Sequence, residues 1–383
     1  MKETLFLLTF ILFVQISNCQ PDKIDALTSP RTSINNLSDI AADIEYIPLE
    51  TTPNSIMGRI INVKIRNKYI YVATVDNKIS CFDASGKYLF NLNKVGKGPE
   101  EYLYCSEFDV NESNSILAVK GSKEIILYNQ VPTGFNFLRR IKLNESPQII
   151  NFIGQNDNIL LQYSNTYGTN PISKELINLK GETLLSWPNF MKFQIQEKMM
   201  VLSRYENTSF NFKNDLYLKE VGNDTIFRFN GSKLDPVLIF DTKNKRVTPE
   251  ARTNVRYYAD HMYEYYILQK FFGSERFIYY TAAFNKDYNI VGIYDKVKKT
   301  RYVVPGKEFF KDDISGGVNF EPQYCNNGTF YSWVDAIKLK SYMSSETFIN
   351  ANVKDPNKHE SLMNLVKNIS ENDNPIIIAT KVR

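Results

Sequence analysis

Short apolar runs separated by polar turn residues dominate the chain from Ile44 onward. Each run has the length and the β-branched and aromatic content of a β-strand. The clearest group holds four runs, at 62–66, 68–73, 78–83 and 88–92, with a turn at 84–87. Four short strands in about 35 residues are the content of one β-propeller blade.

Similar four-strand units recur further along the chain. Copies begin near residues 107, 149, 215 and 267. The last residues of the third strands recur at intervals of roughly 46–65 residues, close to the propeller period of about 40–50. These residues are Asp83, Asn129, Asn178, Asn230 and Asp295. An irregular β-sandwich is the alternative, but it needs only about seven to nine strands.

A sixth unit has to be assembled from both ends of the chain. Apolar runs at 323–333 and 374–381 supply its inner strands, and Ile44–Leu49 supplies an outer strand. Pairing the two ends would leave no unpaired seam in the ring. We therefore predict an all-β fold, a six-bladed β-propeller with four-stranded antiparallel blades, closed by the N- and C-terminal strands.

Helices are expected at two places. Pro356 sits in a favourable first-turn position, and Leu362, Leu365, Val366 and Ile369 share one face, which predicts a short helix near the C-terminus. A second helical stretch is expected within 249–268.

The first residues have the pattern of an export signal. An apolar core at 4–14 follows Lys2 and is too short to span a bilayer. The segment Ile16-Ser17-Asn18-Cys19 resembles a bacterial lipobox, so we expect Cys19 to be lipidated; ordinary cleavage after Cys19 is the alternative. We divide the chain into a signal peptide (1–19), a polar tether (20–43) and a propeller domain (44–383), with the lipid as the domain's only membrane contact.

Several segments together resemble a known family. They are Tyr46-Ile47-Pro48-Leu49-Glu50-Thr51, Phe82-Asp83-Ala84-Ser85-Gly86-Lys87, Val95-Gly96-Lys97-Gly98-Pro99-Glu100 and Asn223-Asp224-Thr225-Ile226-Phe227. The order and spacing of these segments are similar to those of secreted six-bladed β-propeller lipoproteins of Gram-negative gut bacteria. The resemblance covers residues 44–383 and implies a propeller exported to the outer membrane or cell surface, with the periplasm as the alternative location. It implies no catalytic residues.

Composition narrows the function. The 46 basic and 42 acidic residues alternate along the chain without a basic block, so we expect no nucleic-acid partner. Only two histidines are present, His261 and His359, which argues against histidine-based metal sites. Once Cys19 is set apart, Cys81, Cys105 and Cys325 form neither a disulfide framework nor a zinc ligand set, and we expect Cys81 to be buried.

No catalytic motif is present: the chain lacks a dinucleotide-binding glycine motif after a strand, a P-loop, GxSxG and HExxH. Gly96-Lys97-Gly98-Pro99 is better explained as a turn than as a phosphate cradle. We expect no catalytic residue, metal site or cofactor, although Ca²⁺ at the central channel stays open because Asp and Asn are plentiful.

One group of side chains could form a binding lip: Arg252, Arg256, Tyr257 and Tyr258, where tyrosine rings could stack on a sugar. The alternative is a helix packed on the propeller. We hypothesise a non-enzymatic, envelope-anchored propeller that binds a glycan, a peptide or an envelope protein through loops on one face. The alternative function is a lyase or hydrolase using carboxylates or Ca²⁺ at the channel.

Overall fold

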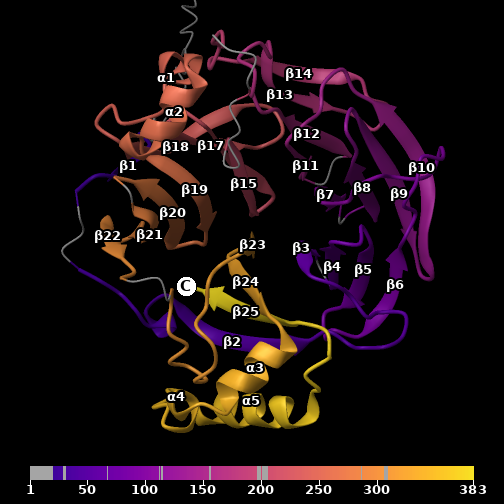
Figure 1. Ribbon diagram of the computed structural model, residues 1–383, viewed down its shortest axis with the longest axis vertical. Helices are drawn as coiled ribbons and strands as arrows, with labels where there is room; N and C mark the ends of the chain where they lie inside the picture. Colours follow the sequence, from indigo (N-terminus) through magenta and orange to yellow (C-terminus); the bar gives the residue numbers. More distant parts are fainter. Residues whose placement is uncertain are drawn as a thin grey trace, which may run out of the picture.

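The computed structural model describes residues 20–28, 32–66, 68–111, 113, 115–154, 157–195, 200, 206–285, 287–305 and 309–383. The predicted signal peptide, including Cys19, lies outside these residues. Figure 1 shows a ring of β-sheets around a centre, with helices at two places on its periphery. The fold is an all-β propeller with a few small helices.

Four sheets contain four strands each and are wholly antiparallel. In each of them, consecutive strands pair with one another, as in a meander. The first two sheets consist of β3 (Ile60–Arg66), β4 (Tyr69–Thr74), β5 (Ile79–Asp83) and β6 (Tyr88–Leu92), then β7 (Phe108–Asn111), β8 (Ile116–Lys120), β9 (Glu124–Val131) and β10 (Gly134–Lys142). The other two consist of β11 (Ile149–Ile153), β12 (Asn158–Gln162), β13 (Ile172–Ile177) and β14 (Thr183–Pro188), then β19 (Ile267–Gly273), β20 (Phe277–Phe284), β21 (Asp287–Asp295) and β22 (Thr300–Val303).

The remaining strands form one nine-stranded sheet, in the order β1-β18-β17-β16-β15-β23-β24-β25-β2. Its two parts meet through a single parallel residue pair, Asn211 with Asn326. The strands are β1 (Asp22–Asp25), β2 (Ala41–Pro48), β15 (Asn207–Phe212), β16 (Asp215–Glu220), β17 (Thr225–Phe229), β18 (Leu234–Asp241), β23 (Tyr324–Asn326), β24 (Thr329–Val334) and β25 (Ile376–Val382).

The prediction of six separate four-stranded blades is therefore wrong. Four sheets are four-stranded blades, and the other strands are hydrogen-bonded into one continuous sheet. The sequence repeat identified groups of strands, but it could not show that β15 and β23 would meet at the inside of the ring. It also did not predict β1, which extends the same sheet at β18.

The predicted joining of the two chain ends is confirmed. Strand β2 pairs antiparallel with β25, with Tyr46 opposite Ile378 and Pro48 opposite Ile376. Ile376, Ile377 and Ile378 are buried, as their continuous apolar run predicted. Pro375 precedes the strand, so its missing N–H removes no hydrogen bond from the ladder.

Helices lie in two of the connections between strands. The predicted C-terminal helix is α5 (Pro356–Asn368), which begins at the Asp355 N-cap and buries Leu362 and Val366. The sequence did not predict the two helices before it, α3 (Ala336–Met343) and α4 (Glu346–Ile349). The helical stretch expected within 249–268 contains α1 (Pro249–Thr253) and α2 (Val255–His261). Two 3-10 turns, Leu37–Asp39 and Met262–Glu264, complete the helical elements of the described residues. No described helix has the length and hydropathy to cross a membrane.

The two ends of the ring are different. Because neighbouring strands are antiparallel, the turns between first and second strands lie at the same end as the turns between third and fourth strands. We call this end the hairpin face; it includes the turns at 213–214, 230–233 and 296–299. The connections that carry α1–α2 and α3–α5 leave from the opposite end, which we call the helix face.

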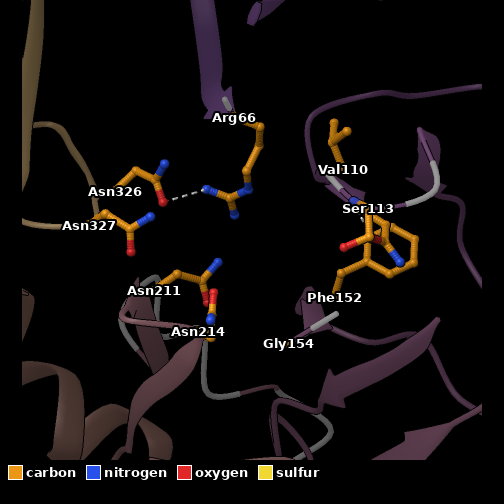
Figure 2. Close-up of a pocket in the computed structure, with 10 residues that line it drawn as sticks. Arg66, Val110, Ser113, Phe152, Gly154, Asn211, Asn214, Asn326 and Asn327 are labelled. Atoms are coloured by element: carbon orange, nitrogen blue, oxygen red, sulfur yellow. Dashed lines mark hydrogen bonds between the residues drawn. The ribbon is translucent and has the colours of Figure 1, made fainter. Parts of the chain in front are cut away.

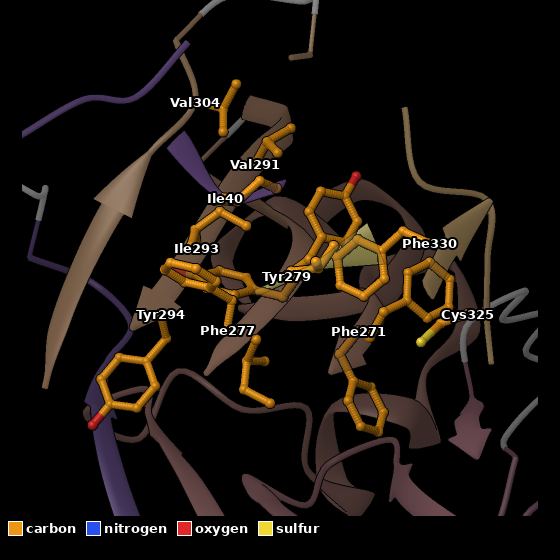
Figure 3. Packing of buried hydrophobic residues seen from close by; sticks show 14 of the residues in the cluster. Ile40, Phe271, Phe277, Tyr279, Val291, Ile293, Tyr294, Val304, Cys325 and Phe330 are labelled. Atoms are coloured by element: carbon orange, nitrogen blue, oxygen red, sulfur yellow. The ribbon is translucent and has the colours of Figure 1, made fainter. Parts of the chain in front are cut away.

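Aromatic side chains fill the core between neighbouring sheets. In the largest cluster, Phe271, Tyr279 and Phe330 pack together with Cys325 (Figure 3). Cys81, Cys105 and Cys325 are all buried and free, so the prediction for Cys81 is confirmed. Interdigitated rings of this kind hold adjacent sheets together without backbone hydrogen bonds.

Candidate functional site

A polar pocket opens at the centre of the ring on the hairpin face. Its volume is about 250 Å³. Figure 2 shows that side chains from several sheets converge on it. It is lined by Arg66, Val110, Asn111, Ser113, Phe152, Gly154, Asn211, Asn214, Asn326 and Asn327.

These residues meet because of where they lie on their strands. Arg66, Asn111, Asn211 and Asn326 are each at or next to the last position of a strand, namely β3, β7, β15 and β23. Each of these strands is the first of its group, and first strands line the inside of a propeller. Residues far apart in the sequence are thereby brought to one opening. The sequence analysis missed this site, although a polar residue at the end of successive first strands was the available signal.

Arg66 is the charged centre of the pocket wall and is held rigidly. Its Nη2 lies 3.0 Å from Asp109 Oδ1, and its Nη1 donates to Asn326 Oδ1 over 3.2 Å and to the Tyr324 hydroxyl. The other oxygen of Asp109 accepts the Phe152 backbone N–H at 2.8 Å. Both members of the ion pair are buried, so the guanidinium charge is balanced in place.

The asparagines differ in how far the protein itself occupies their amides. Asn111 Nδ2 donates to Asp157, and Asn326 Nδ2 donates to the Ile65 carbonyl. Asn214 and Asn327 have φ values of +66° and +47°, so a tight hairpin turn accounts for asparagine at both positions. Neither turn constraint nor a side-chain hydrogen bond to another described residue accounts for Asn211.

Carboxylates near the channel join neighbouring sheets. Glu107 accepts the Ile150 backbone N–H, as Asp109 accepts that of Phe152. Burial raises the pKa of Glu107, although the charge of Lys64 opposes the shift. In the described part of the chain, no three His, Cys, Asp or Glu side chains gather as metal ligands.

The structure separates the residues proposed as a binding lip. Arg252 is fully buried, forms an ion pair with Glu206 and lies 4.8 Å from the Phe193 ring centre. Tyr258 is also buried, whereas Arg256 and Tyr257 are exposed. Only the last two side chains are available to a ligand from solvent, and they lie on the helix side of the ring, away from the polar pocket.

The matched region of a family model reaches almost from one end of the described chain to the other. A domain of unknown function, DUF4934, matches residues 23–381. The chain belongs to the DUF4934 family. The DUF4934 match begins within β1 and ends within β25, so it includes both chain ends that meet in the nine-stranded sheet.

Two solved structures resemble this DUF4934 protein. A candidate exported protein of Bacteroides fragilis has a TM-score of 0.69 and 17% identity, over 93% of this chain and 98% of that one. A member of the DUF4221 family from Bacteroides vulgatus has a TM-score of 0.52 and 10% identity, over 90% and 97% of the two chains. No curated protein matches the sequence. These likenesses support the propeller fold of the family resemblance.

Proposed function

We propose that this DUF4934 protein is a non-enzymatic binding protein that takes a neutral carbohydrate in the pocket on the hairpin face. One observation carries the proposal: amide side chains from separate strand groups converge on one opening beside a charge-balanced arginine. An amide offers both donors and acceptors, which matches sugar hydroxyls that also do both.

The charge balance favours a neutral ligand over an anion. Asp109 already neutralises Arg66, and their short contact leaves little net positive charge at the opening. The Phe152 side chain, which is 5% exposed, adds a small apolar contact to the lining. The cavity is smaller than the roughly 300–1,000 Å³ of pockets for drug-sized ligands, so we expect it to hold one sugar unit or a chain end.

The decisive variant is Asn211→Ala, because the Asn211 amide has no described intramolecular partner to lose. Isothermal titration with glucose, galactose, mannose and glucuronate should show binding of a neutral hexose by the wild type. Loss of one hydrogen bond should weaken it by about five- to tenfold. The matched control is Asn364→Ala, an exposed asparagine on α5, which should bind like the wild type.

Two results would contradict this proposal. If none of the neutral hexoses bound, or if Asn211→Ala and Asn364→Ala bound equally well, the pocket would not be the site. If glucuronate bound most tightly and salt weakened its binding, the charge of Arg66 would dominate the pocket and the ligand would be an anion.

We further propose that the protein is exported and anchored through lipid on Cys19, at the outer membrane or cell surface. The apolar run at 4–14 followed by Cys19 supports this. The B. fragilis protein of similar fold is itself described as a candidate for export. The periplasm is the location expected if cleavage follows Cys19 instead.

The anchor is tested by expressing the full chain and Cys19→Ala in a Gram-negative host and separating membranes from soluble protein. The wild type should sediment with membranes and carry the mass of the acyl groups. Cys19→Ala should lose both properties. Equal membrane association of the two proteins would rule out the anchor.

A further inference from the structure

We propose that one rim of the hairpin face, made of the turns 230–233 and 296–299, rests on phospholipid headgroups when the protein is anchored. We call it the basal rim. The proposal depends on acylation of Cys19 as proposed above. It comes from the position of β1, which places the start of the folded chain beside these turns.

The N-terminus is fixed to the ring almost immediately after Cys19. Asp22 pairs with Leu238 in β18, and both oxygens of its carboxylate accept from Lys299 Nζ, at 2.7 and 2.6 Å. Ile24 is buried in the same core cluster as Phe240. Only Gln20 and Pro21 separate β1 from Cys19. The first residues of the segment 20–43, which was expected to be a polar tether, are therefore part of the fold.

The direction of β1 determines where the anchor emerges. Strand β1 runs parallel to β18, which starts after the turn at 230–233 and leads toward the helix face. The residues before Asp22 therefore run back toward the hairpin face. From Asp22 to Cys19 the chain spans at most about 11 Å. Asp22 pairs with Leu238, four residues after the start of β18 at Leu234. About 13 Å of strand therefore separates Asp22 from the hairpin face, close to the length that the residues back to Cys19 can span.

The basal rim has the chemistry that suits headgroups. The turn after β21 reads Lys296-Val297-Lys298-Lys299, with Val297 72% exposed. Lys298 is exposed, and no ion pair joins it to another described residue. Lys233 on the turn 230–233 is exposed too, and its ammonium lies 3.0 Å from Asp235 Oδ1. Lysines around an exposed apolar tip can bind phosphates while the tip enters the interface.

The test compares two positions that are equally exposed but lie toward opposite faces. Val297 is 72% exposed on the basal rim, and Ile349 is 70% exposed on α4, in the connection at the helix face. Val297→Cys and Ile349→Cys, each in the full acylated chain, are labelled with a polarity-sensitive thiol dye. Cys81, Cys105 and Cys325 are buried and should not react. The proteins are then reconstituted into vesicles of phosphatidylethanolamine and phosphatidylglycerol.

We expect the dye at position 297 to shift to the blue and to be protected from a water-soluble quencher at least threefold, and the dye at 349 to be unchanged. Adding Cys19→Ala should abolish the shift at 297. If vesicle binding required Cys19 but the two dyes behaved alike, the proposed membrane contact of the basal rim would be wrong and the lipid anchor would be supported. If Cys19→Ala bound vesicles as the wild type does, the anchor itself would be wrong.

Discussion

At the scale of single residues, Asn374 shows how one buried amide can organise the joining of two chain ends. Its side chain donates to the carbonyls of Glu50 and Ser55 and accepts the Met57 backbone N–H. Its own N–H donates to Thr51. Asn374 is 3% exposed, and its side-chain amide and backbone N–H are used within the protein. This agrees with the structural role that the sequence predicted for the segment beginning at Asn374.

Asp313 gives a prediction about pH. Burial alone would raise the pKa of Asp313, but hydrogen bonds from Ser38 and the ion pair with Lys354 hold it below its usual value. A lowered carboxyl pKa stabilises the fold above the unfolded-state value of about 4, and that stability is lost as the pH falls through the folded-state pKa. In chemical denaturation at pH 7, Asp313→Asn should lower the free energy of unfolding by about 1 kcal/mol.

The difference between wild type and Asp313→Asn should shrink as the pH is lowered from 5 toward 3. Exposed Asp335, changed to Asn, serves as the control and should leave the unfolding curve unchanged within error. A constant difference across this pH range would show that ionisation of Asp313 does not stabilise the fold.

Single residues of the candidate site were the hardest to predict. Arg252 looked like a surface cation beside tyrosines, yet it pairs with Glu206, a residue 46 positions earlier. Arg66 and Asn211 lacked any local motif, because their proximity arises only when separate strands meet in the ring. Sequence patterns report local periodicity, whereas a pocket of this kind depends on long-range packing.

At the scale of elements, strands with strong alternation or continuous apolar character were predictable, and weakly apolar ones were not. The four strands from β3 to β6 lie where the sequence placed them. Strand β15 was missed because half of its residues are the polar Asn207, Ser209 and Asn211, so it is only weakly apolar. Strand β1 contains one apolar residue, Ile24, and exists because β18 offers it a partner.

Strand β25 is the element whose loss should be most damaging, since it lies between β24 and β2. Deleting residues 374–383 should expose two strand edges and make the protein insoluble or greatly lower its melting temperature. The graded version is Ile377→Ala, which should lower the free energy of unfolding by about 2–5 kcal/mol, because Ile377 is fully buried. Lys381→Ala, at an exposed position of the same strand, is the control.

Thermal denaturation followed by circular dichroism would measure these effects. A truncated protein that stayed soluble and melted with the wild type would show that β25 does not hold the ring together. Equal melting temperatures for Ile377→Ala and Lys381→Ala would show that burial of this strand contributes little.

At the scale of the whole molecule, the repeat of strand groups predicted a propeller but not its hydrogen-bonded sheets. Strand order within a group follows from short turns, which the sequence shows directly. Contacts between groups depend on how closely first strands approach at the centre. The pair Asn211–Asn326 merges two groups into one nine-stranded sheet, and no local pattern marks either residue for that contact.

The joining of β2 to β25 also sets an order of events during synthesis. Their partners are far apart in sequence; the bond from Thr380 to the Asp43 carbonyl spans 337 residues. Synthesis from the N-terminus produces β2 long before β25, so β2 has no β25 to pair with until the last residues are made. The ring can close only after the last strand has been synthesised. The edge of β2 that β25 will cover stays exposed for as long as the rest of the chain takes to be made. A longer delay therefore increases the need for protection against aggregation.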